Sequence, residues 1–116
     1  MKEDIIYLKH ILQAINRIEE YTTDFTHDDF LSNYLVQDAV IRQLEIIGEA
    51  TKRISFATTE NYPHIEWKDV AGMRDKLIHH YMGVDIEILW DTIRQDIPIL
   101  KEEIIRIIQI YQSAEK

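Results

Sequence analysis

Cysteine is absent from the 116 residues, which excludes disulfide bonds, thiolate metal sites and a cysteine nucleophile. A chain without cysteine fits the reducing environment of the cytoplasm. No stretch approaches the roughly 20 apolar residues of a membrane span, and the first residues lack the apolar core of a signal peptide. We therefore expect a cytoplasmic protein that makes no membrane contact.

Positive charge is also scarce. The chain carries 13 lysines and arginines against 21 aspartates and glutamates, which gives a net charge of −8. Domains that bind nucleic acids are usually basic, because contacts with phosphates dominate their affinity. The charge alone therefore favours a protein-binding module. Any RNA site has to be local, weak or shielded by the pairing of two subunits.

Helix-breaking residues are few, with three glycines and two prolines. Apolar residues recur at three- and four-residue steps, the period of an amphipathic helix, and no repeat or linker divides the chain. We predict a single domain over residues 1–116 that is all-α and folds as an antiparallel up-down bundle of four to five helices. The predicted helices cover residues 2–21, 28–54, 67 to about 83, and a last segment that begins after Asp85 and frays over 113–116.

The sequence also predicts the loops that connect these helices and the solvent-facing side of the second helix. Residues 22–27 form a polar turn, and residues 55–66 form the longest loop. Gly83 ends the third helix, Asp85 caps the fourth, and Pro98 kinks the fourth helix or divides it into two abutting helices. A charged stripe along 28–54 is predicted to face solvent; it consists of Asp38, Arg42, Glu45, Glu49 and Lys52.

One pattern in the chain suggests a chemical function. Arg74, His79 and Tyr81 occur in the order R-x4-H-x-Y, with Asp75 directly after the arginine. Arginine donates two parallel hydrogen bonds to phosphate oxygens, and histidine gives or takes a proton near neutral pH. The pattern therefore favours phosphate chemistry. Asp75 precedes His79 by four residues, so its carboxylate is placed to orient the imidazole.

Helical geometry limits how these side chains can meet. Arg74 and His79 are five residues apart and lie about 140° from each other around an ideal helix, so one helix does not converge them well. A two-fold dimer brings two copies of each residue to one cleft, and the spacing therefore favours a site between subunits. Simpler interpretations stay open, in which Arg74 pairs with Glu45 or Glu49 and His79 is an ordinary surface histidine.

Signatures of metal and nucleotide sites are missing from the sequence. There is no H-E-x-x-H motif, no glycine-rich phosphate loop and no dinucleotide fingerprint. The adjacent His79 and His80 point about 100° apart on a helix, which is a poor arrangement for one metal ion. We therefore expect no metal and no cofactor, and assign His80 no role.

The run from Gly72 to Trp90, GMRDKLIHHYMGVDIEILW, resembles HepT-like members of the HEPN superfamily. Those proteins carry a similar Gly-Met-Arg-(Asn/Asp) step, a His-x-Tyr step and a Gly-Val-Asp continuation. The segment RQLEIIGEA at residues 42–50 and Trp67 after the loop are similar to theirs as well. With its helical frame, the likeness covers essentially the whole chain.

The resemblance implies a small all-helical homodimer that acts as a metal-independent endoribonuclease. It implies that Arg74 holds the scissile phosphate of the RNA and that His79 is the general acid or base. It implies further that Asp75 supports Arg74 and His79. It also implies the toxin half of a toxin–antitoxin pair, with an MntA-type minimal nucleotidyltransferase as antitoxin. Tyr81 matches the tyrosine to which that enzyme transfers AMP, which blocks the cleft by charge and bulk.

Two alternatives stay beside the ribonuclease. One is a non-catalytic subunit that binds a nucleotide or a partner, in which Arg74 and Tyr81 matter and no RNA is cut. The other is a purely structural helical dimer, in which the motif only packs.

Overall fold

The chain is all-α, as predicted, and the computed structural model contains no strand in the part it describes. That part comprises residues 2–79 and 85–114, with side chains described for all of them except residues 74–79. The elements in chain order are α1 (Lys2–Thr22), α2 (His27–Leu31), α3 (Tyr34–Lys52), α4 (Phe56–Asn61), α5 (Trp67–His79), α6 (Ile86–Asp91), the π-helical turn η1 (Thr92–Asp96) and α7 (Ile97–Ala114). None of these helices is long and apolar enough to cross a membrane.

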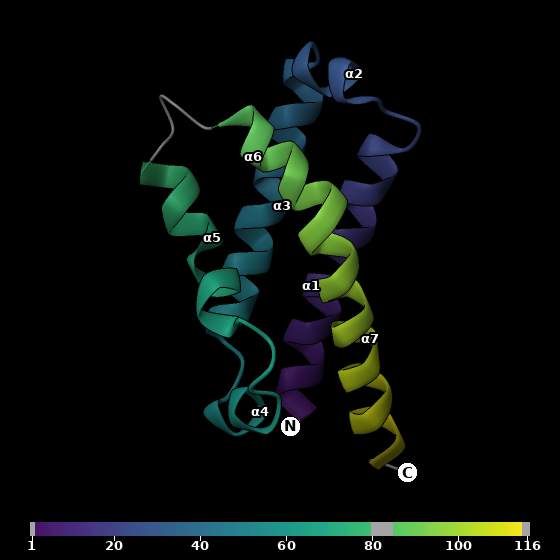
Figure 1. The fold of residues 1–116 in the computed structure, drawn as a ribbon. Coiled ribbons are helices and arrows are strands. Elements are labelled where there is room, and N and C mark those ends of the chain that lie inside the picture. Colours follow the sequence, from purple (N-terminus) through teal and green to yellow (C-terminus); the bar gives the residue numbers. More distant parts are fainter. Residues whose placement is uncertain (1, 80–84, 115–116) are drawn as a thin grey trace.

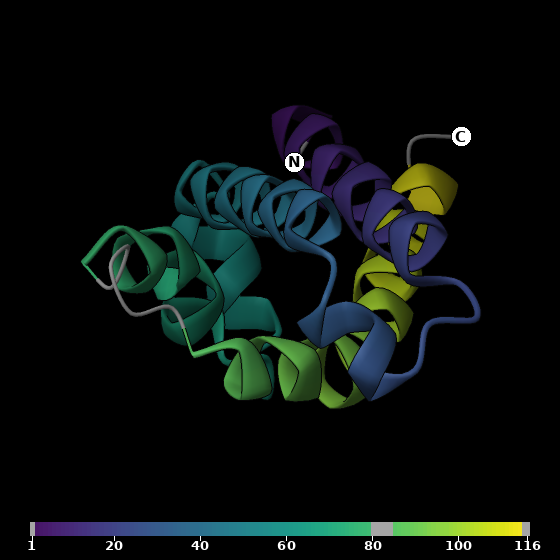
Figure 2. The same ribbon diagram turned by 90° about the horizontal axis from the view of Figure 1, so that it is seen from above.

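The long helices form an up-down bundle, which confirms the predicted architecture. α1 and α5 run in one direction, and α3 and the continuous α6–η1–α7 unit run in the other (Figure 1). Seen from above, the order around the core is α5, α3, α1, α7 (Figure 2), and each neighbouring pair in this order packs closely. The core between them contains fully buried apolar side chains, among them Leu8, Ile11, Ile15, Ile18, Val40, Ile47, Ile104 and Ile107.

The prediction of one helix over residues 28–54 is wrong, because the chain breaks between α2 and α3. The side chain of Asn33 caps α3 by accepting a hydrogen bond from the Val36 amide at 3.0 Å. The side-chain amide of Gln37, in α3, donates to the carbonyl oxygens of Phe30 and Leu31 at 2.8 and 3.2 Å. It thereby supplies hydrogen bonds to carbonyl groups at the C-terminal end of α2. Local capping therefore interrupts an apolar period that continues on both sides of the break.

The predicted loop over residues 55–66 also needs correction, since it contains α4. Ser55 caps this helix, accepting from the Thr58 amide at 3.4 Å. The short helix is held to α1 and α7 by buried polar contacts, because Thr58 bonds to Asp4 at 2.6 Å and to Tyr111 at 2.8 Å. Tertiary contacts stabilise a helix that its own six residues do not specify.

The last helical unit follows the prediction closely. Asp85 caps α6, accepting from the amides of Glu87 and Ile88 at 3.0 and 3.2 Å. The interruption predicted at Pro98 takes the form of the π-helical turn η1, which ends at Asp96, two residues before the proline, and the unit continues through it into α7. α7 continues to Ala114, two residues into the segment 113–116 that is predicted to fray. The predicted end of the third helix at Gly83 lies outside the described residues.

Candidate functional site

Three of the four predicted site residues lie on α5. Arg74, Asp75 and His79 occupy the C-terminal half of this helix, while Tyr81 and His80 lie outside the described residues. The backbone is helical through His79, so the Asp75 and His79 positions are about 40° apart around the axis and those of Arg74 and His79 about 140°. The convergence of the Arg74 and His79 side chains stays a prediction, because these side chains are outside the described part.

The start of α5 is fixed by an aromatic anchor. The indole of Trp67 donates to the carbonyl oxygen of Tyr62 at 2.9 Å, and the Trp67 amide donates to Ile65 at 2.8 Å. Val70, one turn later, is buried. These contacts confirm the prediction that Trp67 opens the helix, and they set its direction along α3. The helix thereby delivers residues 74–79 to the end of the bundle where α6 begins (Figure 1).

The chain that follows the motif is anchored on its far side as well. α6 begins at Ile86, and His27 of α2 contacts Glu87 through its Nε2 atom at 2.5 Å. Trp90 packs against Phe30 with ring centroids 5.2 Å apart, and the Arg94 guanidinium lies 5.0 Å from the Trp90 ring. The motif is thus bounded by two anchored helices. Sequence reasoning missed the His27–Glu87 contact, since no local signal joins residues 60 positions apart.

The charged stripe on α3 behaves mostly as predicted. Arg42 and Glu45 form an ion pair at 3.6 Å, and the arginine is largely exposed. Asp38 and Lys52 are exposed too. With Arg42 largely exposed and Glu45 half-buried, such a pair contributes about 1 kcal/mol or less to stability. A pairing of Arg74 with Glu45 or Glu49 stays untested, because the Arg74 side chain is outside the described part.

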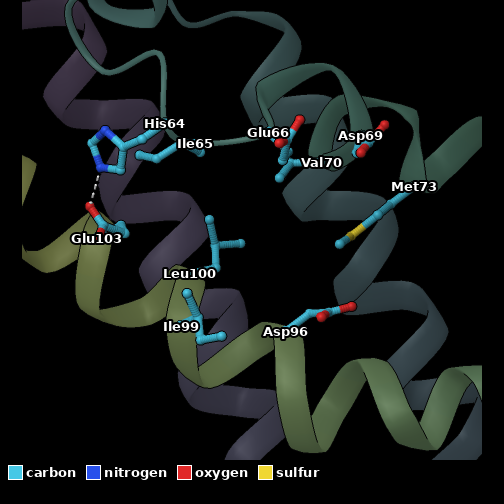
Figure 3. Close-up of a pocket in the computed structure, with 10 residues that line it drawn as sticks. All are labelled: His64, Ile65, Glu66, Asp69, Val70, Met73, Asp96, Ile99, Leu100 and Glu103. Carbon is cyan, nitrogen blue, oxygen red and sulfur yellow. Dashed lines mark hydrogen bonds and ion pairs between the residues drawn. The ribbon is translucent and has the colours of Figure 1, made fainter.

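A groove that the sequence did not reveal lies between α5 and α7, along the seam where the ring of helices is least closely packed. Its volume is about 320 Å³, and Figure 3 shows the labelled side chains around it. It is lined by the loop before α5, the first half of α5, η1 and α7; the lining residues are His64, Ile65, Glu66, Asp69, Val70, Met73, Asp96, Ile99, Leu100 and Glu103. We call this the α5–α7 groove. Four separate segments build it, so no single stretch of sequence carries its signature.

The α5–α7 groove is acidic. Four of its described lining residues are carboxylates, and the one basic side chain among these described residues, His64, is paired with Glu103 at 2.8 Å. The hydrogen bond from His64 lowers the pKa of Glu103 below its ordinary value and outweighs the opposing effect of desolvation. A phosphate group is repelled by such a site, so the groove is no candidate for the RNA backbone. No group of three or more potential metal ligands is assembled in the part of the chain that the structure describes.

The described part of the chain is an all-α bundle with Arg74, Asp75 and His79 on its third long helix, which is consistent with the all-helical fold that the sequence resemblance implies. Comparison with known proteins supports the same assignment. Residues 11–107 match the sequence model of the family described as "Ribonuclease HepT-like", and the chain belongs to this family. The resemblance predicted from the sequence is thereby confirmed.

Several curated relatives are similar over most of this chain. It is 53% identical, over 94% of its length, to the "Gamma-glutamylcyclotransferase and putative RNase" of Methanocaldococcus jannaschii, of which it spans 50%. It is 52% identical to the "Probable ribonuclease HepT" of Thermococcus cleftensis, covering 82% of this chain and 86% of that protein. It is 46% identical to a "Putative RNase" of M. jannaschii, and the match covers 93% of this chain and 94% of that protein. No solved structure matches the chain.

Proposed function

We propose that this chain is an endoribonuclease toxin that cuts RNA without a metal ion. The observation that carries the proposal is the family match, which spans residues 11–107 and therefore includes the whole R-x4-H-x-Y motif. The names of relatives that are covered over most of their length point to the same activity. The helical backbone through His79 supports it further, because it presents Arg74, Asp75 and His79 from one rigid element.

The chemistry assigns one task to each residue. His79, as general base, takes the proton from a ribose 2′-hydroxyl, whose oxygen attacks the adjacent phosphorus. The Arg74 guanidinium binds the phosphate oxygens and stabilises the charge that grows on them. A protonated histidine then returns a proton to the departing 5′-oxygen, which leaves a 2′,3′-cyclic phosphate. Asp75 lies one helical turn before His79 and holds its imidazole in the required tautomer.

An RNA cleavage assay in excess EDTA tests this proposal. The wild-type protein is expected to cut a labelled single-stranded RNA and to leave 2′,3′-cyclic phosphate ends, whereas His79→Ala and Arg74→Ala lose the activity. The matched control is His80→Ala, which removes a neighbouring histidine without a proposed role. Equal cutting by wild type and His79→Ala points to a contaminating nuclease, and cleavage that stops in EDTA contradicts metal independence.

We further propose that Tyr81 is the acceptor of AMP from a nucleotidyltransferase antitoxin. An adenylyl group adds negative charge and bulk beside Arg74 and His79, so it competes with the RNA phosphate by the same logic as phosphorylation. Incubation with a cognate nucleotidyltransferase and ATP is expected to add the mass of one adenylyl group to the tryptic peptide that contains Tyr81. Tyr81→Phe is the control. An unmodified peptide, or an adenylated protein that cuts RNA at the full rate, contradicts this step.

A second candidate function is supported by the charge of the molecule. The net charge of −8 and the acidic α5–α7 groove suit a subunit that binds a protein partner without cutting RNA. In that case wild type and His79→Ala both fail to cut RNA, while Arg74→Ala and Tyr81→Phe weaken binding to the nucleotidyltransferase. A purely structural role is indicated instead if Arg74→Ala and His79→Ala both abolish folding or association.

A further inference from the structure

The α5–α7 groove has two chemically different parts. Its floor is apolar, with Ile65, Val70 and Leu100 each only 7% exposed and Met73 partly buried. At its edge Ile99 is 64% exposed, which is unusual for an isoleucine beside a concave surface. Apolar floors that reach the surface in this way are typical of sites that receive a partner's side chain.

The rim of the groove carries three exposed carboxylates. Glu66, Asp69 and Asp96 are exposed, and no described residue forms an ion pair with any of them. Glu103 differs, because His64 at 2.8 Å and Arg106 at 3.8 Å accompany it. Figure 3 shows Glu66 and Asp69 on one side of the open space and Asp96 on the other. A ligand in the groove therefore has carboxylates on two sides and an apolar surface beneath it.

This arrangement selects among the possible occupants. RNA is excluded by repulsion between phosphates and the three carboxylates. A second copy of this chain offers few basic side chains to the carboxylates of the groove, because its 13 lysines and arginines are outnumbered by 21 aspartates and glutamates. A small polyamine satisfies the charges and leaves the apolar floor and Ile99 without a partner. A protein segment with a large apolar side chain between lysines or arginines satisfies both parts.

We propose that the α5–α7 groove is a docking site for a basic, amphipathic segment of a partner protein, bound in the manner of a helix laid into a groove. On α5, Met73 borders the groove, and the backbone positions of Asp75 and His79 lie about 200° and 240° from it around the helix. The docking site therefore lies on the side of α5 away from the proposed Asp75–His79 pair. The proposal stands independently of ribonuclease activity.

The test uses a synthetic fluorescent peptide in which leucines at helical spacing alternate with lysines, titrated into the full chain and followed by anisotropy. The triple variant Glu66→Gln/Asp69→Asn/Asp96→Asn is expected to bind it roughly tenfold more weakly, the effect of three exposed charge pairs. Ile99→Ser is expected to weaken binding severalfold through the lost apolar contact. A peptide with glutamate in place of lysine is expected not to bind.

The matched control removes three exposed carboxylates that do not line the groove, in the variant Glu3→Gln/Glu20→Gln/Asp38→Asn. It lowers the net negative charge by the same amount and is expected to bind the peptide nearly as well as wild type, since charges beyond about 8 Å are screened at physiological salt. Circular dichroism verifies that every variant is folded.

Four outcomes overturn the proposal. The first is an equal loss in both triple variants, which indicates attraction to the whole acidic surface. The second is unchanged binding by Ile99→Ser. The third is binding of spermidine with the same dependence on the three carboxylates and no binding of the peptide, which assigns the groove to a small polycation. The fourth is a change of oligomeric state in the groove variant, measured by sedimentation, which assigns the groove to a second copy of this chain.

Discussion

Asp4 is a charged side chain inside the protein, with 3% of its surface exposed. It accepts hydrogen bonds from the Ser55 amide at 2.9 Å, the Ser55 hydroxyl at 2.6 Å and the Thr58 hydroxyl at 2.6 Å. Burial raises the pKa of this carboxyl, but the bonds from Ser55 and Thr58 lower it by more, so the pKa lies below its ordinary value of 3.8. One carboxylate thus joins the start of α1 to α4, and through Thr58 to Tyr111 of α7.

Replacing this carboxylate tests its contribution. Asp4→Asn keeps the shape and removes the charge, and the loss of charge-assisted hydrogen bonds is expected to lower the free energy of unfolding by about 2 kcal/mol at pH 7. Because the pKa is lower in the folded state, the stabilisation is present above pH 3.8 and is lost as the pH falls through the folded-state pKa. Urea unfolding at pH 7 and at pH 3 measures both effects.

The control for Asp4 is its neighbour Glu3, which is exposed. Glu3→Gln is expected to unfold with wild-type stability at both pH values, because its carboxylate is already hydrated in the folded state. A difference between wild type and Asp4→Asn that stays constant down to pH 3 contradicts the assignment of a lowered pKa. No difference at pH 7 contradicts the stabilising role of the charge.

At the scale of elements, periodicity predicted where helices lie more reliably than where they end. The apolar stripe of Ile5, Leu8, Leu12, Ile15 and Ile18 predicted α1 to within one residue. Four of these side chains are buried in the core, and Leu12 is partly buried. The break between α2 and α3 escaped the same reasoning. A capping box joins Thr26 and Asp29 at the start of α2. The prediction of one helix over residues 28–54 rested on the apolar period, which continues through the break, and gave such short-range capping signals too little weight.

The junction of α2 and α3 depends on one buried amide, which is itself testable. Gln37 is 6% exposed and donates to two carbonyl oxygens of α2. Gln37→Met keeps the size of the side chain and leaves both carbonyls without this donor, so the free energy of unfolding is expected to fall by about 1–3 kcal/mol. Gln13→Met, at an exposed position of α1, is the matched control. Equal thermal stability of the two variants contradicts the role of Gln37.

Gly72 gives a test of α5 itself, two residues before Arg74. A Cβ atom built at Gly72 meets nothing within 4 Å, and the position is interior to the helix. Gly72→Ala is therefore expected to raise the free energy of unfolding by about 0.5–1 kcal/mol, because alanine restricts the unfolded chain and favours helix. Thermal unfolding monitored by circular dichroism measures the change.

The same substitution reports on what approaches α5 from outside. RNA cleavage by Gly72→Ala at the wild-type rate is expected if the open space beside Gly72 stays empty during the reaction. Higher stability together with lost cleavage instead indicates that RNA or a second subunit comes close to the helix there. A lower stability contradicts the open space itself.

At the scale of the whole molecule, the architecture was predictable and the surface was not. The up-down bundle follows from long amphipathic segments joined by short connections, which admit few other packings. The α5–α7 groove depends on how four segments meet, and its carboxylates are scattered from Glu66 to Glu103 in the sequence. The R-x4-H-x-Y motif was predictable in part. The sequence places Arg74, Asp75 and His79 on one helix, whereas the convergence of their side chains depends on side-chain conformation or on a second subunit.

The separation of Arg74 and His79 around α5 leads to a prediction about subunits. If each site takes Arg74 from one chain and His79 from the other, Arg74→Ala and His79→Ala are each inactive alone and complement each other when mixed. A mixed dimer then holds one intact site and one doubly altered site. Random exchange of subunits makes half of the dimers mixed, so about a quarter of the wild-type cleavage rate is expected to return.

Co-expression of the two variants with different affinity tags, followed by RNA cleavage with the doubly purified dimer, measures this recovery directly. About half of the wild-type rate is expected from that dimer, because one of its two sites is intact. The control is a dimer of Arg74→Ala with itself, purified through the same two tags, which stays inactive. An inactive mixed dimer shows that each chain needs its own arginine and histidine. The turn of about 140° between the two positions then has to be bridged within one helix, by the length of the arginine side chain.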